Sequence, residues 1–150
     1  MTTEERLAKV ERELAELQHE VRTRRVTILD ENGEIRAMLE VAEDGPMLRL
    51  CDAAGKNRAV LVASGAGPML FLSDAAGNGR ATLVATGDET MLTLFNAAGR
   101  ERAGLYVDAD GTMLRLCDAA DKPRAFLAVV KDEPGLGLLD AAGKSIWSAP

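Results

Sequence analysis

Residues 48–69 read LRLCDAAGKNRAVLVASGAGPM, and this stretch decides the fold because the chain repeats it. The same 22-residue pattern begins at Val26 and continues without an insertion to Pro150. Similarity that keeps one period over such a length means that each unit packs mainly against its neighbours. The units cover 26–47, 48–69, 70–91, 92–113, 114–135 and the truncated 136–150.

Each unit predicts two strands. The shared pattern is Leu-x-Leu-x-Asp-x-x-Gly-x-x-Arg-Ala-x-Leu, and both of its apolar runs alternate with a period of two, as half-buried strands do. One face of the two strands carries Leu48 and Leu50, then Ala59, Leu61 and Ala63. We expect these five positions, and their equivalents in the other units, to form the core.

The opposite face of each unit is only partly polar, since it carries residues such as Arg49, Cys51, Val60, Thr82 and Phe126. A sheet that is wetted completely on one side shows a cleaner alternation. We infer that part of this second face touches another layer or another chain. Scattered surface hydrophobic residues, which need no partner, are the alternative.

Turn residues separate the strands. Asp52 to Gly55 suits a tight turn, with Asp bonding backbone N–H groups and Gly accepting a positive φ, and Ser64 to Pro68 supplies the next turn. The predicted fold is an all-β repeat array, an antiparallel meander of about eleven strands packed between chains as a β-prism-like shaft. A β-solenoid is the alternative. The last unit departs from the pattern with Ile146 and Trp147, which we expect to cover the free end of the array.

Residues 1–25 predict a helical coiled-coil segment for oligomerisation. Thr2 and Glu5 match a capping box. Arg6 with Glu11, and Glu20 with Arg25, would form favourable pairs between parallel helices. An amphipathic helix that lies on its own sheet is the alternative, although its apolar stripe would be wider. The apolar stripe of this helix has the heptad spacing of a coiled coil, with its members 3, 4, 3 and 4 residues apart. They are Leu7, Val10, Leu14, Leu17 and Val21.

We therefore expect the chain to bind itself. A single-layer apolar sheet cannot leave a large apolar face in water, and about eleven strands closed into one barrel would leave a lumen that Ala and Leu cannot fill. Leu7 and Leu14 at a positions lack the β-branched preference of dimers, so a trimer is favoured over a dimer.

Composition restricts the partners. The net charge of −6 makes nucleic acid an unfavourable partner, and aromatic residues make up only 3% of the chain. No signal peptide and no apolar run long enough for a membrane span is visible, so the cytoplasm is the default expectation, with export by another route left open. We expect Cys51 and Cys117 to stay reduced, because strands three units apart are too distant for a disulfide.

No enzymatic chemistry is visible in the sequence. His19 is the only histidine, so Ser/His/Asp, Cys/His and multi-histidine metal arrangements are absent from the sequence. Asp30 to Gly33 and Asp108 to Gly111 resemble calcium loops only superficially, and turn chemistry explains both. We expect no enzyme, no catalytic residue, no cofactor and no metal.

One row of side chains could bind a polymer. One arginine recurs in each of five units and could form a ladder for an anionic chain. An Asp recurs equally regularly across the same turn, so local Asp–Arg pairing is the stronger interpretation. The arginines are Arg36, Arg58, Arg80, Arg102 and Arg124.

The repeat resembles the tandem units of uncharacterised bacterial proteins that place such repeats after an N-terminal coiled-coil segment. The resemblance covers nearly the whole chain and implies this architecture, but no catalytic residue. More loosely, a zipper that leads into a β-repeat shaft is similar to trimeric phage fibres and adhesins.

Overall fold

The computed structural model describes residues 1–17 and 23–149, and the side chains of residues 14–17 lie outside the described part. One helix, α1 (Thr3–Leu17), precedes twelve strands. The strands are β1 (Arg25–Leu29), β2 (Ile35–Ala42), β3 (Gly45–Cys51), β4 (Asn57–Ser64), β5 (Gly67–Ser73), β6 (Gly79–Thr86), β7 (Glu89–Phe95), β8 (Glu101–Asp108), β9 (Gly111–Cys117), β10 (Pro123–Val130), β11 (Glu133–Leu139) and β12 (Ser145–Ala149).

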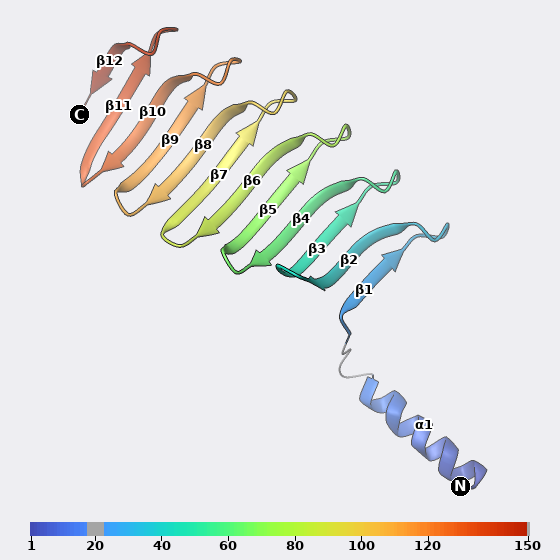
Figure 1. Ribbon diagram of the computed structural model, residues 1–150. Coiled ribbons are helices and arrows are strands. Elements are labelled where there is room, and N and C mark those ends of the chain that lie inside the picture. Colours follow the sequence, from blue (N-terminus) through green and yellow to red (C-terminus); the bar gives the residue numbers. More distant parts are fainter. Residues whose placement is uncertain (18–22, 150) are drawn as a thin grey trace.

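All twelve strands form one open antiparallel sheet in which every strand pairs with the next one along the chain (Figure 1). The predicted repeat array and meander are confirmed, and the solenoid alternative is wrong. The sheet has twelve strands instead of about eleven because the truncated last unit still forms β12. The first and last strands lie at opposite ends of the ribbon, so the sheet does not close into a barrel.

The Asp-containing hairpin tips have one geometry throughout the array. At Asp52, one carboxylate oxygen accepts the backbone N–H groups of Ala54 and Lys56, both at 2.9 Å, and the backbone N–H of Gly55 bonds to the Asp52 carbonyl at 3.0 Å. Gly55 adopts a φ of 73° there, an angle that residues other than glycine rarely adopt. Asn96 replaces the aspartate in the fourth unit and makes the same backbone contacts.

A β-bulge lies beside each of these tips. In the hairpin of β3 and β4, Leu50 pairs with Ala59 and Cys51 with Asn57, so Arg58 is the extra residue on its strand. A bulge re-aims a side chain and increases the local twist of the strands. The corresponding extra residues of the other hairpins are Arg36, Arg80, Arg102, Arg124 and Ile146.

The sheet has two unlike faces. Leu39, Leu48 and Leu61 are directly paired across β2, β3 and β4, and the same pairing continues along the array. We call this side the leucine face and the other side, with Met38 and Arg49, the mixed face.

The expected core positions on the leucine face are not buried within one chain, where Leu50 and Leu61 remain 43% and 44% exposed. Among the described residues, the best buried side chains are Met38, Cys117 and Thr93, all on the mixed face. In a single-layer sheet, a side chain is shielded from water only by its neighbours on the same face. On the mixed face, long side chains such as Tyr106 and Arg115 lie beside the shorter Thr93 and Cys117, whereas from β2 to β11 the leucine face carries no side chain longer than Leu over its leucine and alanine rows.

The helix begins as the sequence predicts. The backbone N–H of Glu5 bonds to the Thr2 hydroxyl at 3.2 Å, and the Glu5 carboxylate accepts the Thr2 N–H at 2.6 Å. The expected helical range through residue 25 is wrong at its end, because Arg25 belongs to β1 and pairs with Glu40. Arg25 also forms an ion pair with Glu40 at 2.6 Å, and its predicted partner Glu20 lies outside the described residues. The β-branched run that follows Arg25 explains why this residue is extended.

Candidate functional site

The leucine face is the largest candidate interaction surface of the chain. Its leucines, with the exception of Leu70, are 38–54% exposed. They occupy every strand from β2 to β11 and pair across the strands without interruption. The exposed members are Leu39, Leu48, Leu50, Leu61, Leu72, Leu83, Leu92, Leu94, Leu105, Leu114, Leu116, Leu127, Leu136 and Leu138.

The surface area of the chain agrees with an unpartnered face. The chain exposes 10,756 Å², whereas a compact monomer of its 16.0 kDa exposes about 7,400 Å². The difference is about 3,400 Å², and the single-layer sheet and α1, which contacts no strand among the described residues, both contribute to it. Patches on soluble monomers seldom exceed a few hundred Å². No side chain of the described residues is completely buried.

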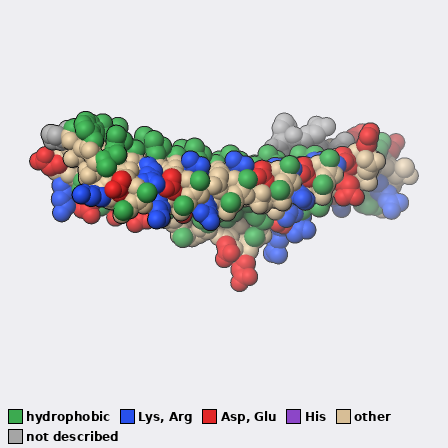
Figure 2. All heavy atoms as spheres, turned by 90° about the horizontal axis from the view of Figure 1, so that it is seen from above, with side chains coloured by type: hydrophobic (Ala, Val, Ile, Leu, Met, Phe, Trp, Pro, Cys, Tyr) green, Lys and Arg blue, Asp and Glu red, His purple; other side chains and the backbone are tan. Residues whose placement is uncertain are grey.

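Hydrophobic and charged side chains are separated along the length of the sheet. Figure 2 shows hydrophobic side chains gathered along one side of the elongated molecule, while acidic and basic side chains alternate over the edge that faces the viewer. The apolar surface is therefore continuous over many units and is not divided by charge.

The helical stripe lies outside the sheet. Leu7 and Val10 are on α1 and are 59% and 57% exposed. Within the described residues, α1 contacts no strand, which does not support the alternative of a helix lying on its own sheet. Leu14 and Leu17 are on α1, but their side chains lie outside the described part, and Val21 lies outside the described residues.

The five repeated arginines occupy the bulge positions described above. Four of them form an ion pair with the aspartate of their own turn: Arg36 with Asp30, Arg58 with Asp52 at 2.5 Å, Arg80 with Asp74 at 3.4 Å and Arg124 with Asp118 at 2.8 Å. Arg102, whose turn carries Asn96, donates to the carbonyl of Cys117 at 3.0 Å. An anionic polymer would have to compete with these contacts.

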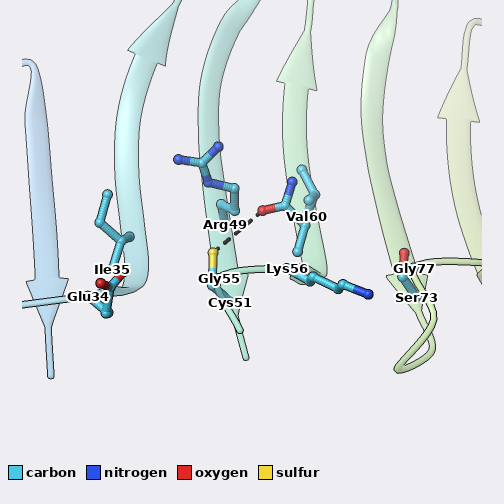
Figure 3. A pocket seen from close by; sticks show the side chains of 10 residues that line it. Glu34, Ile35, Arg49, Cys51, Gly55, Lys56, Val60, Ser73 and Gly77 are labelled. Atoms are coloured by element: carbon cyan, nitrogen blue, oxygen red, sulfur yellow. Dashed lines mark hydrogen bonds between the residues drawn. The ribbon is translucent and has the colours of Figure 1, made fainter. Parts of the chain in front are cut away.

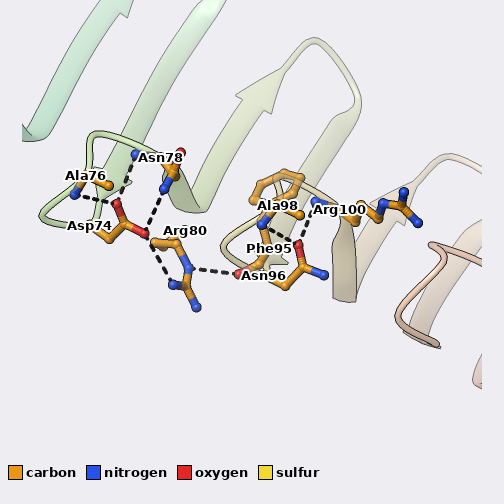
Figure 4. A network of polar contacts seen from close by, with 8 residues as sticks. All are labelled: Asp74, Ala76, Asn78, Arg80, Phe95, Asn96, Ala98 and Arg100. Atoms are coloured by element: carbon orange, nitrogen blue, oxygen red, sulfur yellow. Dashed lines mark hydrogen bonds and ion pairs between the residues drawn. The ribbon is translucent and has the colours of Figure 1, made fainter.

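Some of the arginines also connect one unit to the next. Arg80 bonds to Asp74 in its own turn and donates from Nε to the carbonyl oxygen of Phe95 at 3.0 Å, at the start of the following tip (Figure 4). The bond from Arg102 Nε to the carbonyl of Cys117 is equivalent, and Arg36 donates from Nη1 to the carbonyl of Asp52, one residue further along the next tip. The row therefore holds neighbouring tips in register, a contribution that sequence reasoning missed because the bulge has no separate signal in the pattern.

Four of the tip aspartates, Asp30, Asp52, Asp74 and Asp118, have pKa values below the usual range. The backbone N–H of Lys56 is the largest cause that lowers the pKa of Asp52, and the nearby Arg58 lowers it further. Glu34 and Lys122 play the same part for Asp30 and Asp118. Burial acts in the opposite direction and is outweighed.

A polar cluster specific to the fourth and fifth units lies on the mixed face. Arg115 donates to both carboxylate oxygens of Glu101, at 3.0 and 2.6 Å, and Tyr106 donates its hydroxyl to Glu101 at 2.6 Å. Burial raises the pKa of Glu101, but the hydrogen bonds from Arg115 and Tyr106 outweigh it and bring the pKa below its usual value. Burial, followed by the bond to Glu101, raises the pKa of Tyr106. Sequence reasoning did not identify this cluster.

An open hollow of about 690 Å³ lies on the mixed face around β3 and β4 (Figure 3). Its lining includes Arg49, Cys51, Lys56 and Val60. The Cys51 thiol lies 3.5 Å from the side-chain oxygen of Asn57. Neither the hollow nor its charge is visible in the repeat pattern, which treats Arg49 as a variable position.

The two cysteines are free thiols on β3 and β9. Six spacings of about 4.8 Å between neighbouring strands separate them in the sheet, far more than a disulfide allows. Burial raises the pKa of the Cys117 thiol.

Within residues 1–17 and 23–149, no group of three or more His, Cys, Asp or Glu side chains could hold a metal ion. No helix in the described part of the chain is long and apolar enough to cross a membrane. No protein-family model and no curated protein matches this chain.

Proposed function

We propose that this chain is a non-enzymatic structural protein that assembles with copies of itself through the leucine face, with α1 as a zipper. The observation that carries the proposal is the row of half-exposed leucines that continues from β2 to β11. Burying apolar surface contributes about 25 cal/mol for each Å² removed from water, so such a face favours association strongly.

Copies of the same chain are suitable occupants for this face. The 22-residue period places identical Leu and Ala side chains at regular intervals, so a second copy presents the same spacing to the first. Around a common axis, three such faces would form a narrow apolar core, as in a β-prism-like shaft. The resemblance of the repeat to bacterial proteins with an N-terminal coiled coil supports the same arrangement.

A trimer remains our proposal for the number of copies. Leu7 and Leu14 at the a positions of the heptads support it, because dimers prefer β-branched residues there. A parallel zipper would also bring the N-terminal ends of the sheets together. Association of the helices and of the sheets would thus reinforce each other, since 15 residues of helix are marginal alone.

A lysine in the middle of the leucine face tests the proposal. Leu83 on β6 is 43% exposed and pairs with Leu70 and Leu92. We expect Leu83→Lys to reduce the assembly to smaller species in light scattering, because it would bury one charge per copy in the shared core. Thr82→Lys is the matched control, since Thr82 is adjacent in sequence but on the mixed face. Equal masses for Leu83→Lys and the unmodified chain would count against the leucine face as the interface.

A further inference from the structure

Two arginines occupy the same position of the 22-residue repeat but have different neighbours. Arg49 on β3 and Arg115 on β9 are separated by three repeats, and both lie on the mixed face. Arg115 is fully engaged: it binds the Glu101 carboxylate through two hydrogen bonds, contacts the Tyr106 hydroxyl at 2.7 Å, and lies 4.8 Å from the centre of the Tyr106 ring. This fork geometry is the preferred way for a guanidinium to bind a carboxylate.

Arg49 lacks such a carboxylate among the described residues. The position of Glu101 is occupied by Ile35 three repeats earlier, and the position of Tyr106 by Glu40, which is bound to Arg25. The contact found for the Arg49 guanidinium is to the Met38 sulfur at 3.4 Å, a weak acceptor. Its Nε is buried without a hydrogen-bond acceptor in the described part of the chain.

Arg49 lines the open hollow described above, which has the chemistry of a carboxylate site. Figure 3 places Glu34 and Ile35 on one side of Arg49, and Lys56 and Val60 on the other. The lining side chains Arg49 and Lys56 outweigh the exposed Glu34 by one positive charge. Ile35 and Val60 supply apolar surface next to the guanidinium, so the hollow suits an anion that carries a hydrocarbon group.

We propose that the Arg49 hollow binds a carboxylate from outside the chain, in the way that Arg115 binds the chain's own Glu101. The carboxylate would accept hydrogens from the Nη groups of Arg49, and its apolar part would lie between Ile35 and Val60. Lys56 would add attraction from the rim. The ligand class is a small organic carboxylate or a carboxylate side chain of another protein molecule, and the inference does not depend on the proposed assembly.

Nitrogen-15 NMR of the arginine Nε–H groups in the full chain tests the proposal, with benzoate as the probe and neutral benzamide as its isosteric control. The Arg49 signal is assigned by its loss in Arg49→Lys. We expect benzoate to shift that signal saturably at millimolar concentration and benzamide to leave it unchanged. The Arg115 signal, which reports a guanidinium already bound to Glu101, should respond to neither compound.

Two variants exchange the surroundings of the twin arginines. Ile35→Glu supplies the carboxylate that Arg115 has, so benzoate binding at Arg49 should weaken at least tenfold. Glu101→Gln removes the carboxylate from Arg115, whose signal should then respond to benzoate. If the Arg49 signal shifts when the protein is diluted in the absence of benzoate, the proposal is supported, and the carboxylate bound by Arg49 belongs to a second copy of the protein. Equal responses to benzoate and benzamide, no response to benzoate without such a dilution shift, or unchanged binding in Ile35→Glu would overturn it.

Discussion

Gly67, at the start of β5, lies so close to the carbonyl oxygen of Ala85 on β6 that a Cβ added to Gly67 would overlap this oxygen. Its φ of 130° is also one that other residues rarely adopt. Gly45 has the same relationship to Ala63 and Gly111 to Val129. Glycine at this position therefore allows the end of one strand to approach the backbone of its neighbour.

Replacing Gly67 by alanine should consequently destabilise the sheet by about 2–3 kcal/mol, because backbone atoms must move to remove the overlap. Urea unfolding at fixed protein concentration measures this change. Gly65→Ala is the control two residues away, since nothing lies within 4 Å of its added Cβ and its φ is not positive. A similar loss for both variants would show that the close approach to Ala85 is not the cause.

Asp121 should be replaceable by glycine with a gain in stability. It occupies the tip position that Gly55 holds in the second unit, and its φ is 67°, which strains a residue with a side chain. We expect Asp121→Gly to raise the free energy of unfolding by roughly 0.5–1 kcal/mol. Gly55→Asp, the reverse exchange at φ 73°, should lower it by a similar amount. Thermal unfolding of the two variants in parallel gives the comparison.

Asn96 tests the side-chain bonding of the tips without a change of charge. Its side-chain oxygen accepts the N–H groups of Ala98 at 2.9 Å and Arg100 at 3.0 Å. Asn96→Ala removes both bonds and should cost about 1 kcal/mol of stability. Asn96→Asp keeps them, adds a carboxylate near the bulge residue Arg102 and should unfold no earlier than the parent chain. Identical urea midpoints for Asn96→Ala and the parent would contradict the role of this tip.

Low pH should destabilise the hairpin tips that carry an aspartate. The folded chain holds the pKa values of Asp30, Asp52 and Asp118 below their usual value, chiefly through backbone N–H donors. A carboxyl group with a lowered folded pKa contributes stability above its unfolded pKa and loses it as the pH falls through the folded pKa. Thermal midpoints should therefore be steady near neutral pH and fall below about pH 4. Stability that increased below pH 4 would show that these carboxylates do not stabilise the tips.

The period-two pattern and the turn residues were enough to predict the meander and its repeat length. Leu48 and Leu50 alternate with Arg49 and Cys51, which indicates a strand. The segment Asp52 to Gly55 marks a reversal of the chain direction. These signals are local, so one unit contains them completely. The bulge at Arg58 could not be predicted, because it depends on how two strands meet at the tip and leaves the spacing of the repeat unchanged.

Burial could not be predicted from alternation alone. The pattern separates the two faces correctly and assigns the leucine face to the core, but it does not show how much of that face one chain leaves exposed. In a single-layer sheet, burial follows the size of neighbouring side chains: Tyr106 lies over Gly104, and Phe126 lies over Gly137. These pairs, like the Glu101–Arg115 contact, join positions that vary between units, so a consensus pattern hides them.

The mass of the full chain in solution tests the central claim most directly. Light scattering at several protein concentrations gives this mass without a label or a variant. Self-assembly through the leucine face requires a multiple of the 16.0 kDa chain, and the trimer corresponds to about three times that mass. A folded species of 16.0 kDa at all concentrations, with the β-sheet signal intact in circular dichroism, would contradict the account.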